Sequence, residues 1–179
     1  MVSFDVLWLF LNSCIVQLIY NLMKPGTFTQ MYVQLVFAVK NRETLLTKSI
    51  RDQVFQYIGG INTNLKHKSI IVNGTSNHVH ILFGLNPTIS VSETVYHIKR
   101  SSSLFINNEK LCFYHFSWQE GYGGFTYSRS QLDNIYKYIE NQEMHHANES
   151  FRKEYISMLE KSETEYDPRF LFDFFDDIP

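Results

Sequence analysis

Hydrophobic and polar residues alternate with two different periods along the first half of the chain. Every second residue from Val33 to Val39 is apolar, which predicts a strand with one face in a core. From Lys48 to Leu65, apolar residues recur at spacings of three and four, which predicts a helix despite two consecutive glycines. Two apolar runs joined by the turn sequence NGTSN predict a hairpin. The expected elements are a strand within residues 29–41, a helix over 48–65, and strands within 66–74 and 78–86.

The second half of the chain continues this pattern. Pro87 and a capping box from Ser90 to Glu93 predict the start of a helix. Aromatic-rich segments then predict two strand pieces, and periodic apolar residues predict a long helix from Ser130 into the MHHANE sequence. The strand pieces are expected in residues 113–119 and 123–128, and a last helix over 150–163. This order predicts an α+β fold, an antiparallel sheet with helices packed on it, of the ferredoxin-like or RRM-like class.

Length and composition indicate one domain with an addition at each end. The chain has 179 residues, of which 44% are hydrophobic, enough for a single core. Residues 1–22 are nearly all apolar but lack a basic start and a cleavage site. We therefore expect an extension there, and neither a secretory signal nor a membrane anchor. The main domain is placed at residues 23–160, followed by an acidic tail at 161–179.

Charge and cysteine content bear on what the protein could bind and on the compartment in which it works. The net charge is −2, but residues 160–179 carry −5 and residues 23–159 carry +4, so a basic patch that binds nucleic acid is compatible with the sequence. Two isolated cysteines without a metal-binding spacing favour the reducing cytoplasm.

The sequence TSNHVHILFG places two histidines one residue apart at the start of a predicted strand. Successive side chains of a strand point to opposite faces, so the two imidazoles would lie on the same face. The core face would contain Val79, Ile81 and Phe83, and the other face His78, His80 and Leu82. A metal site and an ordinary half-buried strand both fit this pattern, and residues elsewhere must decide between them.

The helix after Ser130 offers two polar side chains for the same site. Its periodicity predicts a packed face of Leu132, Ile135, Tyr136, Ile139 and Glu143. Tyr138 and Gln142 are four residues apart at the flank of that face and would stack. Gln142 is the candidate third ligand and Tyr138 the candidate nucleophile, whereas Tyr136 is expected in the core. An ordinary amphipathic helix with a tyrosine at its rim remains an alternative.

Together these motifs resemble a known family. The pair His78 and His80, followed by Tyr138 and Gln142 in the sequence YIENQ, is similar to the HUH-class single-tyrosine transposases of small insertion sequences. The resemblance extends over roughly residues 28–174 and includes WQEGYGGFTYSRSQLDNIYKYIENQ. One departure is Asn77, where members often have an acid, and this puts the orientation of His78 in doubt.

The resemblance implies an activity and a set of partners. Such enzymes cut and rejoin single-stranded DNA at the hairpin-bearing ends of an element, through a 5′-phosphotyrosine formed here by Tyr138. Two imidazoles and an amide oxygen, from His78, His80 and Gln142, would hold Mg²⁺ or Mn²⁺. No ATP or other small-molecule cofactor is expected. A homodimer is expected, with the histidines of one chain meeting the tyrosine of the other, and the glycines around Gly123 would permit that exchange.

The remaining candidates are contacts to DNA. The basic residues proposed to bind phosphate are Lys99, Arg100, Arg129 and Lys137, and the aromatic residues that would stack on bases or fill the core are Trp118, Tyr122, Phe125 and Tyr127. His145 and His146 are interpreted as cations at a helix end. Two other functions stay open at this stage: a non-catalytic nucleic-acid-binding module, and a replication initiator or relaxase with the same chemistry.

Overall fold

A computed structural model of the chain describes residues 28–41, 45–147 and 149–174. Its centre is a four-stranded antiparallel sheet with the strand order β2-β3-β1-β4. The strands are β1 (Tyr32–Ala38), β2 (Lys68–Gly74), β3 (His78–Gly84) and β4 (Gly123–Tyr127). The helices are α2 (Lys48–Asn64), α3 (Val91–Asn108), α4 (Leu132–Glu140), α5 (Gln142–His146) and α6 (Phe151–Lys161), with 3-10 turns η2 (Arg129–Gln131) and η3 (Pro168–Phe170). The predicted α+β class is confirmed.

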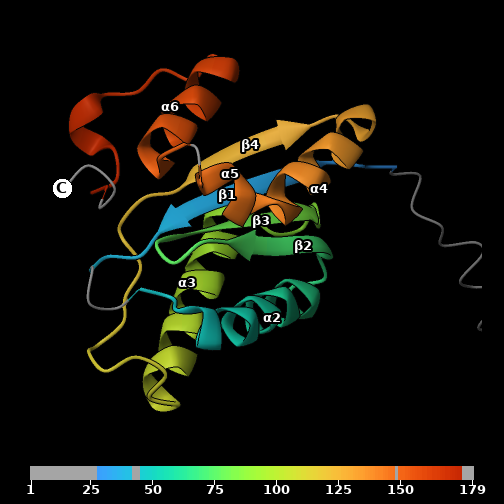
Figure 1. Cartoon of the computed structure of the whole chain (residues 1–179). Helices are drawn as coiled ribbons and strands as arrows, with labels where there is room; N and C mark the ends of the chain where they lie inside the picture. Colours follow the sequence, from blue (N-terminus) through green and yellow to red (C-terminus); the bar gives the residue numbers. More distant parts are fainter. Residues whose placement is uncertain (1–27, 42–44, 148, 175–179) are drawn as a thin grey trace, which may run out of the picture.

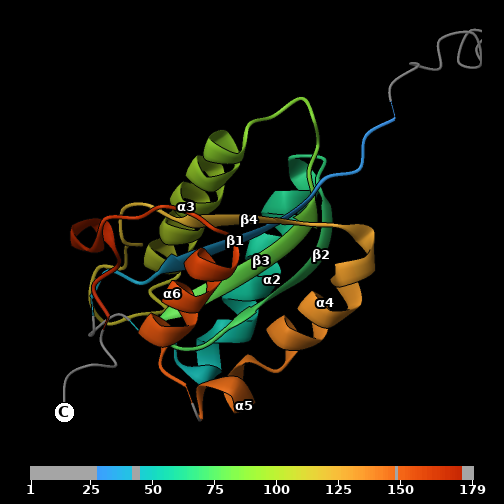
Figure 2. The same cartoon turned by 90° about the horizontal axis from the view of Figure 1, so that it is seen from above.

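The helices form layers on both faces of the sheet, as Figures 1 and 2 show: α2 and α3 cover one face, and α4, α5 and α6 lie on the other. The larger core lies on the side of α2 and α3, where Val79, Ile81 and Phe83 of β3 are fully buried. On the opposite side, Leu82 packs with Ile139 in a smaller cluster. The alternation predicted for β3 is therefore confirmed, and both histidines face α4, α5 and α6.

The predicted strand over residues 113–119 is wrong. Trp118 makes only an isolated bridge to Val39, and the segment is otherwise irregular. Its backbone is held by a side chain instead, because Asn107 accepts from the Phe116 amide at 2.8 Å and donates to the Phe116 carbonyl at 3.0 Å. The aromatic density that resembled a strand serves the core: Trp118 packs edge-on against Phe37, with ring centroids 4.8 Å apart.

The long helix expected after Ser130 is interrupted. Helix α4 ends at Glu140, Asn141 leaves the helical region, and α5 begins at Gln142. The carbonyls freed at this break are satisfied from the sheet, because the Asn73 amide on β2 donates to the Ile139 carbonyl at 2.8 Å and the Glu140 carbonyl at 3.0 Å. The break is thus part of the packing of α4 on β2.

The buried side of this helix differs from the predicted one. Tyr136 is 38% exposed, so its expected place in the core is wrong. Glu143, also assigned to the packed face, is half-exposed and forms ion pairs with Lys48 and Arg51 of α2. Gln142, expected at the flank, is fully buried, because the helix turns that side towards the histidines of β3.

Helix α6 packs on the sheet beside β4 through Phe151, Tyr155 and Leu159, which all belong to the larger core cluster. Part of the predicted acidic tail packs on this helix: the ring centroids of Phe172 and Tyr155 are 4.8 Å apart. The amide of Gln119 fixes the same segment by bonding to both the amide and the carbonyl of Asp173. No helix among the described residues has the length and apolar character needed to cross a membrane. The apolar residues 1–22 lie outside the described part of the chain.

A glycine permits the close approach of α6 to the sheet. A Cβ built on Gly123 would lie 2.7 Å from Cε2 of Tyr155 and 2.9 Å from Cε2 of Phe125, both closer than van der Waals contact. The neighbouring Gly124 has no such constraint, because its Cβ would meet Tyr122 at 3.5 Å.

We predict that Gly123→Ala lowers the free energy of unfolding by about 1–3 kcal/mol, because the added methyl overpacks the contact with Tyr155. Gly124→Ala, one residue away in the same strand, is the matched control and should change it by less than about 1 kcal/mol. Chemical denaturation of the two variants measures the difference. Equal losses would show that α6 does not depend on the absence of a side chain at residue 123.

Candidate metal and nucleophile site

Four elements bring their polar side chains to one point on the inner side of α4, α5 and α6. His78 and His80 come from β3, Tyr138 from α4, Gln142 from the first position of α5, and Glu154 from α6. Both histidines and Gln142 are fully buried, and Glu154 is 2% exposed. The two histidines and the glutamate offer ligand atoms that all lie within 4.8 Å of one another.

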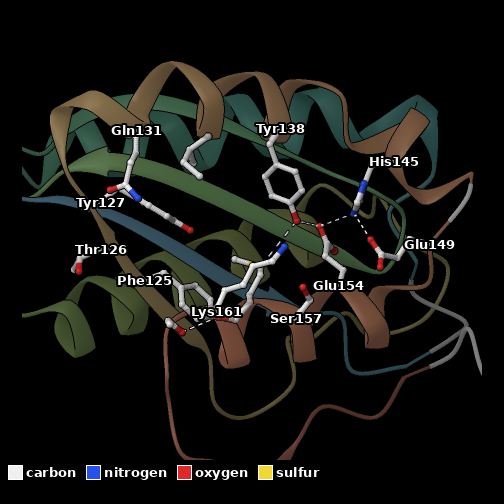
Figure 3. Close-up of a pocket in the computed structure, with 13 residues that line it drawn as sticks. Phe125, Thr126, Tyr127, Gln131, Tyr138, His145, Glu149, Glu154, Ser157 and Lys161 are labelled. Atoms are coloured by element: carbon white, nitrogen blue, oxygen red, sulfur yellow. Dashed lines mark hydrogen bonds and ion pairs between the residues drawn. The ribbon is translucent and has the colours of Figure 1, made fainter.

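The carboxylate of Glu154 occupies the centre of this group. It accepts hydrogen bonds from the Tyr138 hydroxyl and, at 3.0 Å, from the Gln142 amide nitrogen. One of its oxygens, Oε2, lies 3.5 Å from Nε2 of His78, and the other, Oε1, lies 3.4 Å from Nε2 of His80. Figure 3 shows the Tyr138 hydroxyl meeting this carboxylate across the space between α4 and α6.

A second set of side chains orients the two histidines. Nδ1 of His78 donates to Oδ1 of Asn77 at 2.8 Å, so Asn77 supplies the acceptor that orients this ring. Nδ1 of His80 lies 2.8 Å from the side-chain amide of Gln34, which in turn accepts from the Tyr127 hydroxyl. In both rings the Nε2 atom therefore points into the site.

Burial controls the charges at this site. Burial lowers the pKa of His78 well below its usual value, and the neighbouring His80 adds to the effect, so the His78 ring is neutral. Burial alone would raise the pKa of Glu154, but His80 and the hydrogen bond from His146 outweigh it and hold that pKa well below its usual range. Burial, followed by the charge of Glu154, raises the pKa of Tyr138, which is therefore a protonated phenol.

The atoms that converge here suit a cation. With its proton on Nδ1, neutral His78 directs a lone pair from Nε2 at Oε1 of Gln142, 3.2 Å away, and that oxygen also has only lone pairs to offer. Nε2 of His80 is buried and, within the described residues, has no hydrogen-bond partner. Two imidazoles, an amide oxygen and an ionised carboxylate form a donor set for a divalent metal ion.

A comparison with protein families decides the identity of the chain. Residues 27–142 match the family model described as "Transposase IS200 like", which covers well over half of the sequence. The chain belongs to the IS200-like transposase family. The matched residues include both histidines, Tyr138 and Gln142, and they end before Glu154.

Solved structures share the fold of this transposase. The crystal structure of an inferred transposase from Deinococcus radiodurans R1 is 22% identical, with a TM-score of 0.51 over 65% of this chain and 94% of that one. A REP-associated tyrosine transposase bound to a REP hairpin is 14% identical, with a TM-score of 0.50 over 69% of this chain and 74% of that one. A comparison with curated proteins gave no match.

Three residues of the transposase site were missing from the set predicted from sequence. Glu154 was not proposed, although it is an acid on the otherwise apolar side of α6, between Phe151 and Tyr155, and that position is a usable signal. His145 and His146 lie in the last turn of α5, as expected for helix-end cations, but they also contact the acids of the candidate site. Nε2 of His146 lies 2.9 Å from Glu154, and Nε2 of His145 lies 3.8 Å from it and 3.0 Å from Glu149.

The four basic residues proposed from sequence lie on different sides of the transposase. Lys99 and Arg100 belong to α3, on the face opposite the site. Lys99 donates to the carbonyls of Gln119 and Gly121, and burial lowers its pKa to about 8. Arg129 and Lys137 are exposed on η2 and α4, on the same side of the sheet as the histidines.

The aromatic candidates divide in a similar way. Trp118 and Phe125 are buried in the core cluster, which leaves no ring face for a base. Tyr122 is 37% exposed and Tyr127 is half-buried beside the site.

Tyr138 meets the histidines of its own chain. Its ring centroid lies 5.8 Å from that of His80, and its hydroxyl bonds to Glu154, which contacts both histidines. The resemblance led us to expect a tyrosine donated by a second chain. The homodimer stays a prediction, but within one chain every group of the candidate site is already present.

Proposed function

We propose that this transposase cleaves and rejoins single-stranded DNA through a covalent 5′-phosphotyrosine at Tyr138. The observation that carries the proposal is the hydrogen bond from the Tyr138 hydroxyl to Glu154, at the point where His78, His80 and Gln142 converge. A nucleophile next to a cation-binding donor set is the arrangement that phosphodiester cleavage requires. Membership of the family supports DNA as the substrate.

In this proposal the chain supplies the nucleophile and its base. The Tyr138 oxygen attacks the scissile phosphorus, the bond from phosphorus to the 3′ oxygen breaks, and the 5′ phosphate stays on the tyrosine. Because the pKa of Tyr138 is raised, a free phenolate is disfavoured, and the proton must leave as the oxygen attacks. The Tyr138 hydroxyl already donates a hydrogen bond to Glu154, so this carboxylate is the nearest acceptor for the proton, even though its lowered pKa makes it a weak base. The reverse reaction, with a different 3′ hydroxyl, rejoins the strand without an external energy source.

The metal ligands are proposed to be Nε2 of His78, Nε2 of His80 and Oε1 of Gln142, with a Glu154 oxygen as an additional ligand. Imidazole and carboxylate oxygen together suit Mn²⁺, and the oxygen donors also accept Mg²⁺. When bound, the ion supplies Lewis-acid polarisation of the phosphate and stabilises charge on the leaving oxygen. Asn77 accepts from Nδ1 of His78 and so leaves Nε2 of that ring with a lone pair for the ion. Gln34 holds the His80 ring, and its amide would have to turn its oxygen to Nδ1 for Nε2 of His80 to bind the ion.

The DNA partner is proposed from one solved relative. That relative is bound to a REP hairpin, and hairpin-bearing ends of a DNA element are therefore the first substrates to test here. Arg129 and Lys137 are the proposed phosphate contacts on the side of the sheet that holds the site. Lys99 and Arg100 stay candidates for DNA that reaches the opposite face.

We expect Tyr138→Phe to abolish the covalent adduct that the wild-type protein forms with labelled single-stranded DNA from the flanks of its own gene. Tyr136→Phe is the matched control, because that hydroxyl lies two residues away in the same helix and on its exposed side. Denaturing electrophoresis detects the adduct. A non-catalytic DNA-binding protein would form no adduct in any variant, and an adduct of wild-type yield in Tyr138→Phe would reject the assignment of the nucleophile.

Glu154→Gln should weaken the binding of Mn²⁺ at least about 10-fold, as should His80→Ala, because each removes a donor of the proposed set. Glu143→Gln, which changes a half-exposed acid of α5 outside the site, should bind the ion as the wild type does. Titration calorimetry measures the affinities.

A chelator should stop adduct formation while leaving the melting temperature nearly unchanged, since the core and not the ion stabilises the fold. Unaltered Mn²⁺ binding in Glu154→Gln would remove the carboxylate from the ligand set. A large fall in melting temperature on chelation would indicate a structural metal instead.

A further inference from the structure

A cavity of about 400 Å³ lies beside Tyr138, between α4, α6 and β4 (Figure 3). Its volume falls within the range of sites that hold small molecules. The Tyr138 hydroxyl and the Glu154 carboxylate lie between Tyr127 and Gln131 on one side and His145 and Glu149 on the other, so the cavity opens directly onto the candidate site. The proposed chemistry uses only this middle part, and the rest of the cavity has no role assigned to it so far.

The walls of the cavity combine flat apolar surface with scattered polar groups. The apolar part comes from Phe125, Tyr127, Ile135 and Met158, and the polar part from Gln131, Ser157, Ser162 and Lys161. An aromatic and aliphatic wall fits the face of a nucleic-acid base, and hydroxyl and amide groups fit its edge. The combination differs from the core, which is almost entirely apolar.

The cavity contains charged groups of both signs. Glu149 and Glu154 line it, and Lys161 is the one lysine or arginine among the described residues that do so. Figure 3 shows the Lys161 side chain extending into the cavity towards Tyr138. The lysine therefore offers a positive group that attracts a negatively charged ligand group, such as a phosphate, to the neighbourhood of Tyr138.

The spacing in α6 explains how one helix supplies both the acid and the lysine. Glu154 and Lys161 are seven residues apart, or two helical turns, and Ser157 and Met158 lie between them on the same face. The adjoining side of α6 carries the core residues Phe151, Tyr155 and Leu159. Helix α6 also lies beyond the residues matched by the family model, which end at residue 142.

We propose that this cavity holds one nucleotide of the substrate strand, the nucleotide joined to the scissile phosphate. Its base lies against Tyr127, Ile135 and Met158, and Lys161 pairs with the next phosphate along the strand. The proposal rests on the proposed function, because the position of Tyr138 in the cavity defines which nucleotide is held. It makes the wall of the cavity a determinant of the sequence that is cut.

The test compares the contribution of single phosphates to binding in two proteins. Single-stranded oligonucleotides that span the mapped cleavage site each carry one neutral methylphosphonate, and their affinities are measured by fluorescence anisotropy in the presence of a chelator. For the wild type, neutralising the phosphate adjacent to the scissile one should weaken binding about 10-fold, the effect of losing one charge-assisted hydrogen bond. In Lys161→Met the same change should have no further effect, whereas the other positions should keep theirs.

Two variants complete the design. Lys153→Met removes an exposed lysine of the same helix that does not line the cavity, and it should reproduce the wild-type profile. We expect an abasic residue next to the cleavage site to weaken adduct formation by the wild type. Ser157→Phe places a ring in the cavity, so the same abasic residue should cause no additional loss in that variant. Its Mn²⁺ affinity should match that of the wild type, which verifies that the neighbouring site is intact.

Identical methylphosphonate profiles for the wild type and Lys161→Met would overturn the proposal, as would an abasic effect that persists in Ser157→Phe. Either result, obtained with a protein that still forms the covalent adduct, would leave the proposed function in place. Absence of the adduct in the wild type itself would instead reject the proposed function, and this inference with it.

Discussion

The candidate site depends on the hydrogen bonds that surround the buried carboxylate of Glu154. An ionised group with 2% exposure is costly unless donors surround it, and here the Tyr138 hydroxyl, the Gln142 amide and His146 all donate to it. These donors come from two elements, α4 and α5, and the carboxylate itself from a third, α6. The carboxylate of α6 thereby links this helix to α4 and α5 above β3. The hydrogen bond that each donor makes to it fixes the orientation of that donor.

The sheet sets the position of that point. Because β3 is paired on both sides, with His80 opposite Val36 of β1 and Asn73 of β2, its register is fixed, and so is the face of both histidines. Asn73 then holds the break between α4 and α5, which allows Gln142 to turn inward. On the other side, Gly123 lets Tyr155 approach β4 and so sets the distance of α6 from the histidines. The site is built on rigid elements.

Much of this arrangement follows from local sequence pattern, and the rest depends on contacts between distant segments. Alternation in β3 correctly placed both histidines on one face, since side-chain direction in a strand is a matter of period alone. The spacing of Tyr138 and Gln142 likewise predicted that they would be neighbours. The break at Asn141 was not predictable, because the Asn73 side chain that satisfies it comes from a strand 66 residues away. The packed face of α4 was also assigned incorrectly, so Tyr136 was expected in the core although it is 38% exposed.

Glu154 illustrates a different limit. Its position on the apolar side of α6 marks it as unusual, but only the packing of α6 over β3 shows what it contacts. The strand expected in residues 113–119 failed because aromatic residues have high strand propensity and are equally suited to filling a core from a loop, as Phe116 and Trp118 do.

The central claim is that one chain assembles the tyrosine with its own histidines, and mixing two inactive variants tests it most directly. His78→Ala retains the nucleophile and Tyr138→Phe retains both histidines, so each lacks one half of the site. The two proteins are co-refolded, association between them is verified with distinct tags, and covalent adducts with single-stranded DNA are measured. The account predicts no adduct in the mixture, because every chain carries its own defect. An adduct that appears on the His78→Ala chain would contradict it and would show that the active sites are shared between two chains.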